Sequence, residues 1–223
     1  MQPEFILVTG ANGTGKTTLI ESNRSVLEAA GFKIIIPDNI LKYATSHTDA
    51  PAVIQEHVDN ALSQRSNFIL ESPFQFQSLI TTIDQIRETG YSLSLYQLFV
   101  DNVMKSAIRV KDRFKEGGLY INTSQVEANF NANLNNVGGQ YDRFDHAYFI
   151  DNSTNREMKL AAEFKGPLLI RYHSIASLYL RDLFEQEGVM EKIDRHTLKV
   201  IQANKDYTSE VLRQSLPRRR LKF

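Results

Sequence analysis

A short stretch near the start of the chain has the residue types and spacing of a phosphate-binding loop. Residues 10–17 read GANGTGKT, which fits the pattern GxxxxGK[ST]. Glycines let the backbone wrap closely around phosphates, and successive N–H groups then form an anion-binding nest. In such a loop the lysine reaches the β- and γ-phosphates and the threonine hydroxyl ligates Mg²⁺. We therefore expect ATP and Mg²⁺ as cofactors, with contacts from Gly10, Ala11, Asn12, Gly13, Thr14, Gly15, Lys16, Thr17 and Thr18.

Two carboxylates follow apolar runs that are typical of buried strands. Asp38 comes just after the run 34–36, and Glu71 directly follows the run 68–70. Ligands of α/β proteins bind at the carboxyl ends of such strands. We expect Asp38 to act as a general base or to orient a substrate hydroxyl, Glu71 and Ser72 to contact the substrate, and Glu71 also to hold Mg²⁺. The structural alternative is that both acids begin the helices that follow them.

Two arginines could supply positive charge from outside the loop. Arg109 and Arg113 are four residues apart in a segment expected to be helical, so they share one face. Transfer of a phosphoryl group requires cations near the developing charge, and we expect a catalytic role for both. The alternative is a solvated basic helix face.

The elements that must position these residues alternate along the chain. Apolar runs separated by amphipathic stretches predict a parallel sheet covered by helices on both faces. We expect an α/β fold of the P-loop NTPase type with five to six strands, at 5–8, 34–36, 68–70, 93–100, 147–150 and 168–170. The helices are expected at 16–30, 51–65, 75–88 and 102–115. The turn 151–153 after the fifth strand is expected to shape the adenine side of the site.

One segment departs in composition from the rest of the chain. Residues 122–136 hold six asparagines, yet Val126, Phe130, Leu134 and Val137 recur at helical spacing. We interpret it as a polar helix with one apolar seam. Glycine pairs on both sides favour a movable lid at about 117–140, and a surface excursion with flexible ends is the alternative. The predicted domains are a kinase-like domain at 1–173 and a C-terminal helical extension at 174–223.

Composition excludes several classes of protein. Among 223 residues, 26 Lys and Arg balance 26 Asp and Glu, so no general nucleic-acid binder is indicated. Cysteine is absent, which excludes disulfides, thiolate metal sites and cysteine nucleophiles. Neither a membrane-spanning run nor a signal peptide is expected, and a cytoplasmic location is predicted.

The P-loop alone does not define the reaction. A guanine-reading NKxD motif is missing, and so is a strand that ends in Asp-Glu, as an oligomeric ATPase requires. A carboxylate after the second strand fits a small-molecule kinase. The alternative function is an ATP-binding module that engages a protein partner without phosphotransfer.

With these residues in view, the chain resembles the zeta toxin family of P-loop kinases. The matching segments follow the family's order: GANGTGKT (10–17), IIIPDNI (34–40), ILESP (69–73), GYSLSLYQLFVDN (90–102), AIRVKDRFKEGG (107–118) and FIDNS (149–153). The chain departs from the family after 118, where GGLYIN replaces the usual GGH.VP, and at 126–131, where the family helix is arginine-rich.

The resemblance implies ATP-dependent phosphorylation of a sugar hydroxyl, typically on UDP-N-acetylglucosamine. It also implies that Lys16 contacts the ATP phosphates, that Asp38 is the base and that Arg109 is a lid arginine. An antitoxin-like protein partner is part of the same expectation. The departures after 118 favour either another acceptor or the binding-module alternative.

Overall fold

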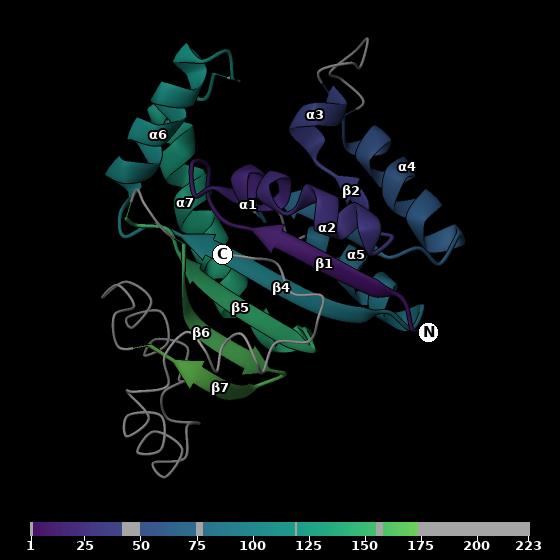
Figure 1. The fold of residues 1–223 in the computed structure, drawn as a ribbon. Helices are drawn as coiled ribbons and strands as arrows, with labels where there is room; N and C mark the ends of the chain where they lie inside the picture. The colour runs from purple at the N-terminus through teal and green to yellow at the C-terminus, as the bar shows by residue number, and fades with distance from the viewer. Residues whose placement is uncertain (1, 42–49, 75–77, 119, 155–157, 174–223) are drawn as a thin grey trace.

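The fold is built around one twisted sheet of seven strands. The computed structural model describes residues 2–41, 50–74, 78–118, 120–154 and 158–173. In spatial order the strands run β2-β3-β1-β4-β5-β6-β7 (Figure 1). Their bounds are β1 Glu4–Thr9, β2 Lys33–Ile35, β3 Phe68–Ser72, β4 Ser92–Phe99, β5 His146–Asp151, β6 Lys159–Lys165 and β7 Leu168–Tyr172.

Helices cover both faces of this sheet, as predicted. They are α1 Lys16–Ser22, α2 Arg24–Ala29, α3 Pro37–Leu41, α4 Ala50–Ser63, α5 Ser78–Glu88, α6 Val103–Lys115 and α7 Thr123–Gly138. Side chains alternate along β1, so that Ile6 and Val8 pack with α1 and α2 while Phe5 and Leu7 face the core shared with α4, α5 and α7. Figure 1 shows α6 and α7 side by side at the end of the sheet where β1 and β4 finish.

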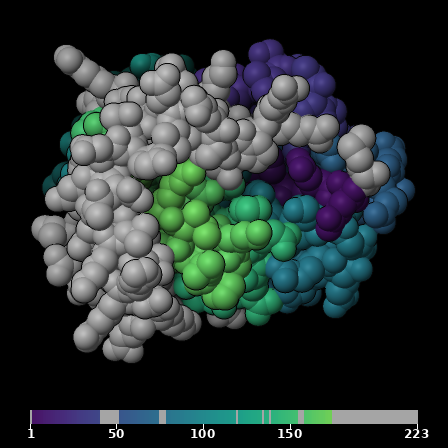
Figure 2. All heavy atoms as spheres, turned by 60° about the horizontal axis from the view of Figure 1, so that its bottom comes forward, coloured from purple at the N-terminus to yellow at the C-terminus, as the bar shows by residue number. Residues whose placement is uncertain are grey.

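The sheet differs from the prediction at one edge. Strands β1 to β5 pair in parallel, but β6 is antiparallel to β5 and β7 is antiparallel to β6. Strand β6 was not predicted, and the expected sixth strand is β7. Only the residues Gly166 and Pro167 separate these two strands, and a loop this short permits only an antiparallel hairpin. The hairpin lies at the molecular surface (Figure 2), where Leu168 is 58% exposed.

The first predicted helix is divided into two. The segment 16–30 is broken at Asn23, which ends α1 and begins α2. The buried Asn23 side chain donates to the Leu19 carbonyl at 2.8 Å. Asparagine side chains compete in this way with the regular helical ladder, and apolar spacing does not reveal the break.

The asparagine-rich segment forms α7, with Val126, Phe130 and Val137 buried along the predicted seam. Asn122 is its N-cap, because the side chain accepts a hydrogen bond from the amide of Gln125 at 2.8 Å. Within the described ranges, no helix is long and apolar enough to cross a membrane. The predicted C-terminal extension at 174–223 lies outside the described residues.

Candidate active site

The loop between β1 and α1 has the compact geometry that a phosphate-binding loop requires. Gly10 has a φ of 147°, and a Cβ at this position would overlap the Leu98 carbonyl oxygen and lie 2.5 Å from Thr14 Oγ1. Gly15 has a φ of 98°, and its Cβ would lie 2.6 Å from Asn152 Nδ2. Position 10 therefore demands glycine on steric grounds as well as by conformation, because the Leu98 carbonyl is backbone. At Gly15 the near atom is the end of a side chain, so its positive φ is what favours glycine.

Lys16 lies inside this loop rather than in solvent. Its side chain is buried, and Nζ donates to the carbonyls of Gly10 at 2.9 Å and Ala11 at 3.2 Å. Burial lowers the Lys16 pKa, and the nearby Glu71 carboxylate opposes that shift. The ammonium is thus held at the centre of the loop by main-chain oxygens, where a phosphate would meet it.

Glu71 faces Lys16 and Thr17 from the end of β3. The residue is 8% exposed, its Oε2 accepts from Thr17 Oγ1 at 2.8 Å, and its Oε1 lies 3.9 Å from Lys16 Nζ. Burial raises the Glu71 pKa, and the positive charge of Lys16 works against the rise. Desolvation thus disfavours the charged form on both sides of the pair.

These oxygens suit Mg²⁺ in kind and number. Mg²⁺ prefers hard oxygen ligands and keeps several waters, so one or two protein oxygens suffice when phosphates complete its shell. The Thr17 hydroxyl and the Glu71 carboxylate already touch, which places two such oxygens together. Among the described residues no group of three or more His, Cys, Asp or Glu side chains could hold a metal without phosphates.

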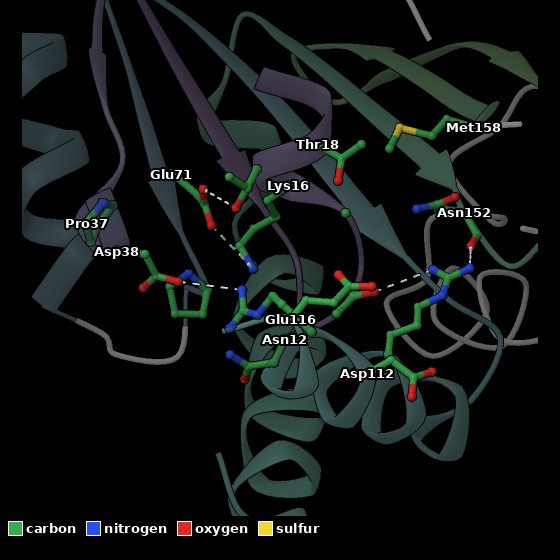
Figure 3. A pocket seen from close by; sticks show the side chains of 16 residues that line it. Asn12, Lys16, Thr18, Pro37, Asp38, Glu71, Asp112, Glu116, Asn152 and Met158 are labelled. Atoms are coloured by element: carbon green, nitrogen blue, oxygen red, sulfur yellow. Dashed lines mark hydrogen bonds and ion pairs between the residues drawn. The ribbon is translucent and has the colours of Figure 1, made fainter. Parts of the chain in front are cut away.

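Asp38 and Arg113 meet in the same cavity, close enough that both charges act on Lys16 and Glu71. Asp38 lies in the first turn of α3, and its Oδ2 is 3.5 Å from Nη1 of Arg113 on α6. Both side chains are partly exposed, at 39% and 38%. A dashed line from Asp38 in Figure 3 marks this ion pair, and the carboxylate points in the direction of Lys16. Two of the predicted residues, from distant parts of the chain, are therefore in contact.

Arg109 is directed to the other end of the same cavity. It donates to the Gly13 carbonyl at 3.4 Å and to the Asn152 carbonyl at 2.8 Å (Figure 3). Asn152 in turn donates from Nδ2 to the Thr14 carbonyl at 2.9 Å. The turn after β5 is thereby tied to the phosphate-binding loop. The arginines share a helix face, as predicted, but contact different walls.

All of these groups line one cavity of about 630 Å³ (Figure 3). A volume of this size is typical of small-ligand sites. The predicted residues in its lining are Asn12, Gly13, Gly15, Lys16, Thr17, Thr18, Asp38, Glu71, Arg109 and Arg113. The lining also includes Pro37, Pro73, Asp112, Glu116, Asn152 and Met158. The predicted residues Gly10, Ala11 and Thr14 belong to the loop but not to the described lining. The Thr14 hydroxyl stabilises the loop by donating to the Ala11 carbonyl at 2.8 Å.

Ser72 is not part of the described lining. Its Oγ accepts from the amide of Phe74 at 3.1 Å and so belongs to the turn after β3. The prediction missed Asp112 and Glu116, although their spacing from Arg109 and Arg113 places all four on one helix face. It also missed the asparagines of α7 that contact the phosphate-binding loop and the turn after β3. The unusual number of asparagines in this segment was the signal that could have revealed them.

A buried strand, a glycine-rich loop and a helix that begins at Lys16 define a P-loop nucleotide-binding protein. A sequence model of the zeta toxin family matches residues 1–158, and the chain belongs to that family. A curated relative is a Haemophilus influenzae protein described as uncharacterized, 27% identical over 125 residues, or 54% of this chain and 88% of the relative.

Solved structures share the fold at low sequence identity. One chain of the AvrRxo1-ORF1 and AvrRxo1-ORF2 complex with sulphate ions superposes on this chain with a TM-score of 0.64 and 19% sequence identity. The match covers 81% of this chain and 63% of that one. The present chain thus spans less than two thirds of that neighbour. The PezAT chromosomal toxin–antitoxin system of Streptococcus pneumoniae gives a TM-score of 0.58 and 17% identity, covering 95% and 88%.

Proposed function

We propose that this chain is an ATP-dependent kinase that phosphorylates a hydroxyl group of a small molecule. The observation that carries the proposal is that Lys16, Thr17 and Asp38 line the same cavity, with Asp38 close enough for its charge to act on Lys16. Nucleotide binding requires only the phosphate-binding loop. A carboxylate near the phosphate end is what a hydroxyl acceptor requires in addition.

Each group has a distinct role in the proposed reaction. Lys16, with Arg109 and Arg113, stabilises negative charge on the transferring phosphoryl group. The acceptor oxygen forms a bond to the γ-phosphorus while the bond from that phosphorus to the ADP oxygen breaks. The hydroxyl proton goes to the Asp38 carboxylate. Thr17 and Glu71 would hold Mg²⁺, which would neutralise charge on the phosphates when bound.

Arg113 must leave Asp38 before it can act on the phosphoryl group. The two form an ion pair that is open to solvent, and such pairs are weak. A phosphate group that competes for the guanidinium would therefore separate them at small cost. Separation frees the carboxylate for the acceptor hydroxyl.

The acceptor that we propose to test first is a nucleotide sugar such as UDP-N-acetylglucosamine, on the basis of the family resemblance. An antitoxin-like protein partner is also proposed. Its support is that the PezAT neighbour belongs to a toxin–antitoxin system and that AvrRxo1-ORF1 was solved with AvrRxo1-ORF2. A related AvrRxo1 structure was solved with ATP, which supports the same choice of nucleotide.

One observation favours the second candidate, an ATP-binding module that engages a protein without phosphotransfer. Residues 117–140 contain no lysine, arginine or histidine. A lid that closes over phosphates would normally contribute positive charge. If the segment does not supply charge to a reaction, it is free to serve as a binding surface.

Transfer of label from γ-labelled ATP distinguishes the two candidates. The protein is incubated with Mg²⁺ and UDP-N-acetylglucosamine and then with a cell metabolite extract, and Lys16→Ala serves as the inactive control. Label in a nucleotide sugar establishes both kinase and acceptor. Label in another metabolite keeps the kinase and discards that acceptor. Nucleotide binding without any labelled product establishes the binding module.

A further inference from the structure

Three asparagines of α7 point into the molecule. Asn129, Asn133 and Asn136 are spaced by four and three residues and so share one helix face, which we name the asparagine face. Asn133 is only 1% exposed, whereas Asn131 and Asn135 on other sides of the helix are exposed. A buried carboxamide is tolerated only when its donors and acceptor are bonded.

Asn133 joins the ends of three strands. Its Nδ2 donates to Thr9 Oγ1 at 3.1 Å and to the Pro73 carbonyl at 2.8 Å. Its Oδ1 accepts from Gln97 Nε2 at 2.7 Å. Thr9 ends β1 immediately before the phosphate-binding loop, Gln97 lies on β4, and Pro73 directly follows β3. One side chain thereby fixes the loop that carries Lys16 relative to the turn after Glu71.

Asn136 and Asn129 extend the same connection at both ends. Asn136 Nδ2 donates to the Phe74 carbonyl at 2.8 Å. Phe74 has a φ of 48°, a left-handed conformation that a bulky residue adopts only where its surroundings enforce it. Asn129 Nδ2 donates to Oδ1 of Asn12, within the phosphate-binding loop, at 2.8 Å. The asparagine face thus forms hydrogen bonds both to the turn after β3 and to the phosphate-binding loop.

We infer that the asparagine face of α7 is a positioning element that holds Glu71 against Thr17 for Mg²⁺. The inference rests on the proposed function, which assigns the metal to these two residues. Glu71 is separated by one residue from Pro73, whose carbonyl is fixed by Asn133. Mg²⁺ demands near-ideal geometry from its ligands, so a small movement of this turn weakens binding. Residues that orient metal ligands typically contribute 10- to 100-fold to metal affinity.

The test uses two variants of the face and two matched controls on the same helix. Asn136→Asp keeps the size of a partly exposed side chain and removes the donor to Phe74. Asn133→Ala removes all three bonds of the buried carboxamide. Asn131→Asp and Asn135→Ala make the same changes at exposed positions. The measurement is the calorimetric affinity of the full chain for AMP-PNP, without Mg²⁺ and across a Mg²⁺ titration, together with the unfolding temperature.

We expect both controls to match the wild type. Asn136→Asp, whose bond lies in the turn after β3 alone, should keep its Mg²⁺-free affinity for AMP-PNP within about twofold. Both variants of the face should need about 10- to 100-fold more Mg²⁺ for half-maximal tightening. A lower unfolding temperature with an unchanged Mg²⁺ requirement would overturn the inference, because the face would then serve packing alone. An unchanged Mg²⁺ requirement in Glu71→Gln would also overturn the inference, because Glu71 would then not hold the metal.

These outcomes separate the inference from the proposed function. If the wild type binds Mg²⁺ and AMP-PNP but transfers no phosphate, the kinase proposal fails while the binding data still test the asparagine face. If the wild type shows no Mg²⁺-dependent tightening at all, both proposals are overturned.

Discussion

Replacement of Asp38 by asparagine separates catalysis from stability. The carboxamide would keep the shape of the side chain but could not take the acceptor proton. General base catalysis typically contributes 10²- to 10⁴-fold in rate, or about 3–5 kcal/mol of barrier. We therefore expect kcat for phosphate transfer to fall by at least about 10²-fold. The affinity for ATP should change little, since the nucleotide wall of the cavity is intact.

The structure also limits the effect of this change on stability. Asp38 and Arg113 are 3.5 Å apart, and at that distance two unit charges in water attract by about 1 kcal/mol. Both side chains are more than a third exposed, so solvent screening reduces the net contribution to about 0.2–1 kcal/mol. For a domain of this size, the melting temperature should fall by no more than about 2–4 °C.

The assay measures labelled phosphate transfer and thermal unfolding on the same preparations. Asp112→Asn is the matched control, because Asp112 lines the same cavity from α6 but pairs with Lys115 at 2.7 Å. The control should retain near-normal kcat. If Asp38→Asn folds normally and keeps its rate within about fivefold of the wild type, the assignment of Asp38 as base is refuted.

Three further predictions concern the loop, the buried acid and the core. Gly10→Ala forces a Cβ onto the Leu98 carbonyl oxygen at a φ of 147°. It should cost about 1–3 kcal/mol in unfolding free energy, measured by chemical denaturation, and abolish nucleotide binding, measured by calorimetry. Gly139→Ala is the control and should be neutral in both measurements, because the space around Gly139 is open. Burial raises the Glu71 pKa above its ordinary 4.5, so the protonated acid stabilises the fold and this contribution is lost as the pH rises through the folded-state pKa. In Glu71→Gln, the curve of unfolding free energy against pH should therefore be flatter above pH 4.5 than in the wild type. An unchanged slope would contradict the argument from burial. Tyr91→Phe removes a hydroxyl whose single hydrogen is shared between the carbonyls of Ala61 and Ser66, and it should cost about 1 kcal/mol with no change in kcat.

Local sequence predicted most of the fold because each element carries its own pattern. The five parallel strands are short apolar runs, and the helices between them show amphipathic spacing. Strand β6 was not predicted because its sequence, KLAAEFK, is short and mixes charged and small residues. Its place in the sheet depends on pairing with β5 and β7, which is a tertiary property.

The nucleotide wall of the site could also be predicted from the sequence. Its contacts come from consecutive backbone amides and from side chains within one loop, so eight adjacent residues specify them. The positions of Asp38, Glu71 and the arginines could be predicted at strand ends and on one helix face. Which of them touch could not be predicted, because spacing along the chain does not fix how α6 packs over the sheet.

The sequence by itself therefore determined the class of protein and the location of its phosphate-binding loop. Only the tertiary structure decided that Arg113 pairs with Asp38 and that Arg109 turns to the loop. It also gave the asparagines of α7 their partners, since Asn129 reaches a residue 117 positions away in the chain. The physical reason is that hydrogen bonds and ion pairs act over a few ångströms in space, and distant segments come that close only once the sheet and helices have packed.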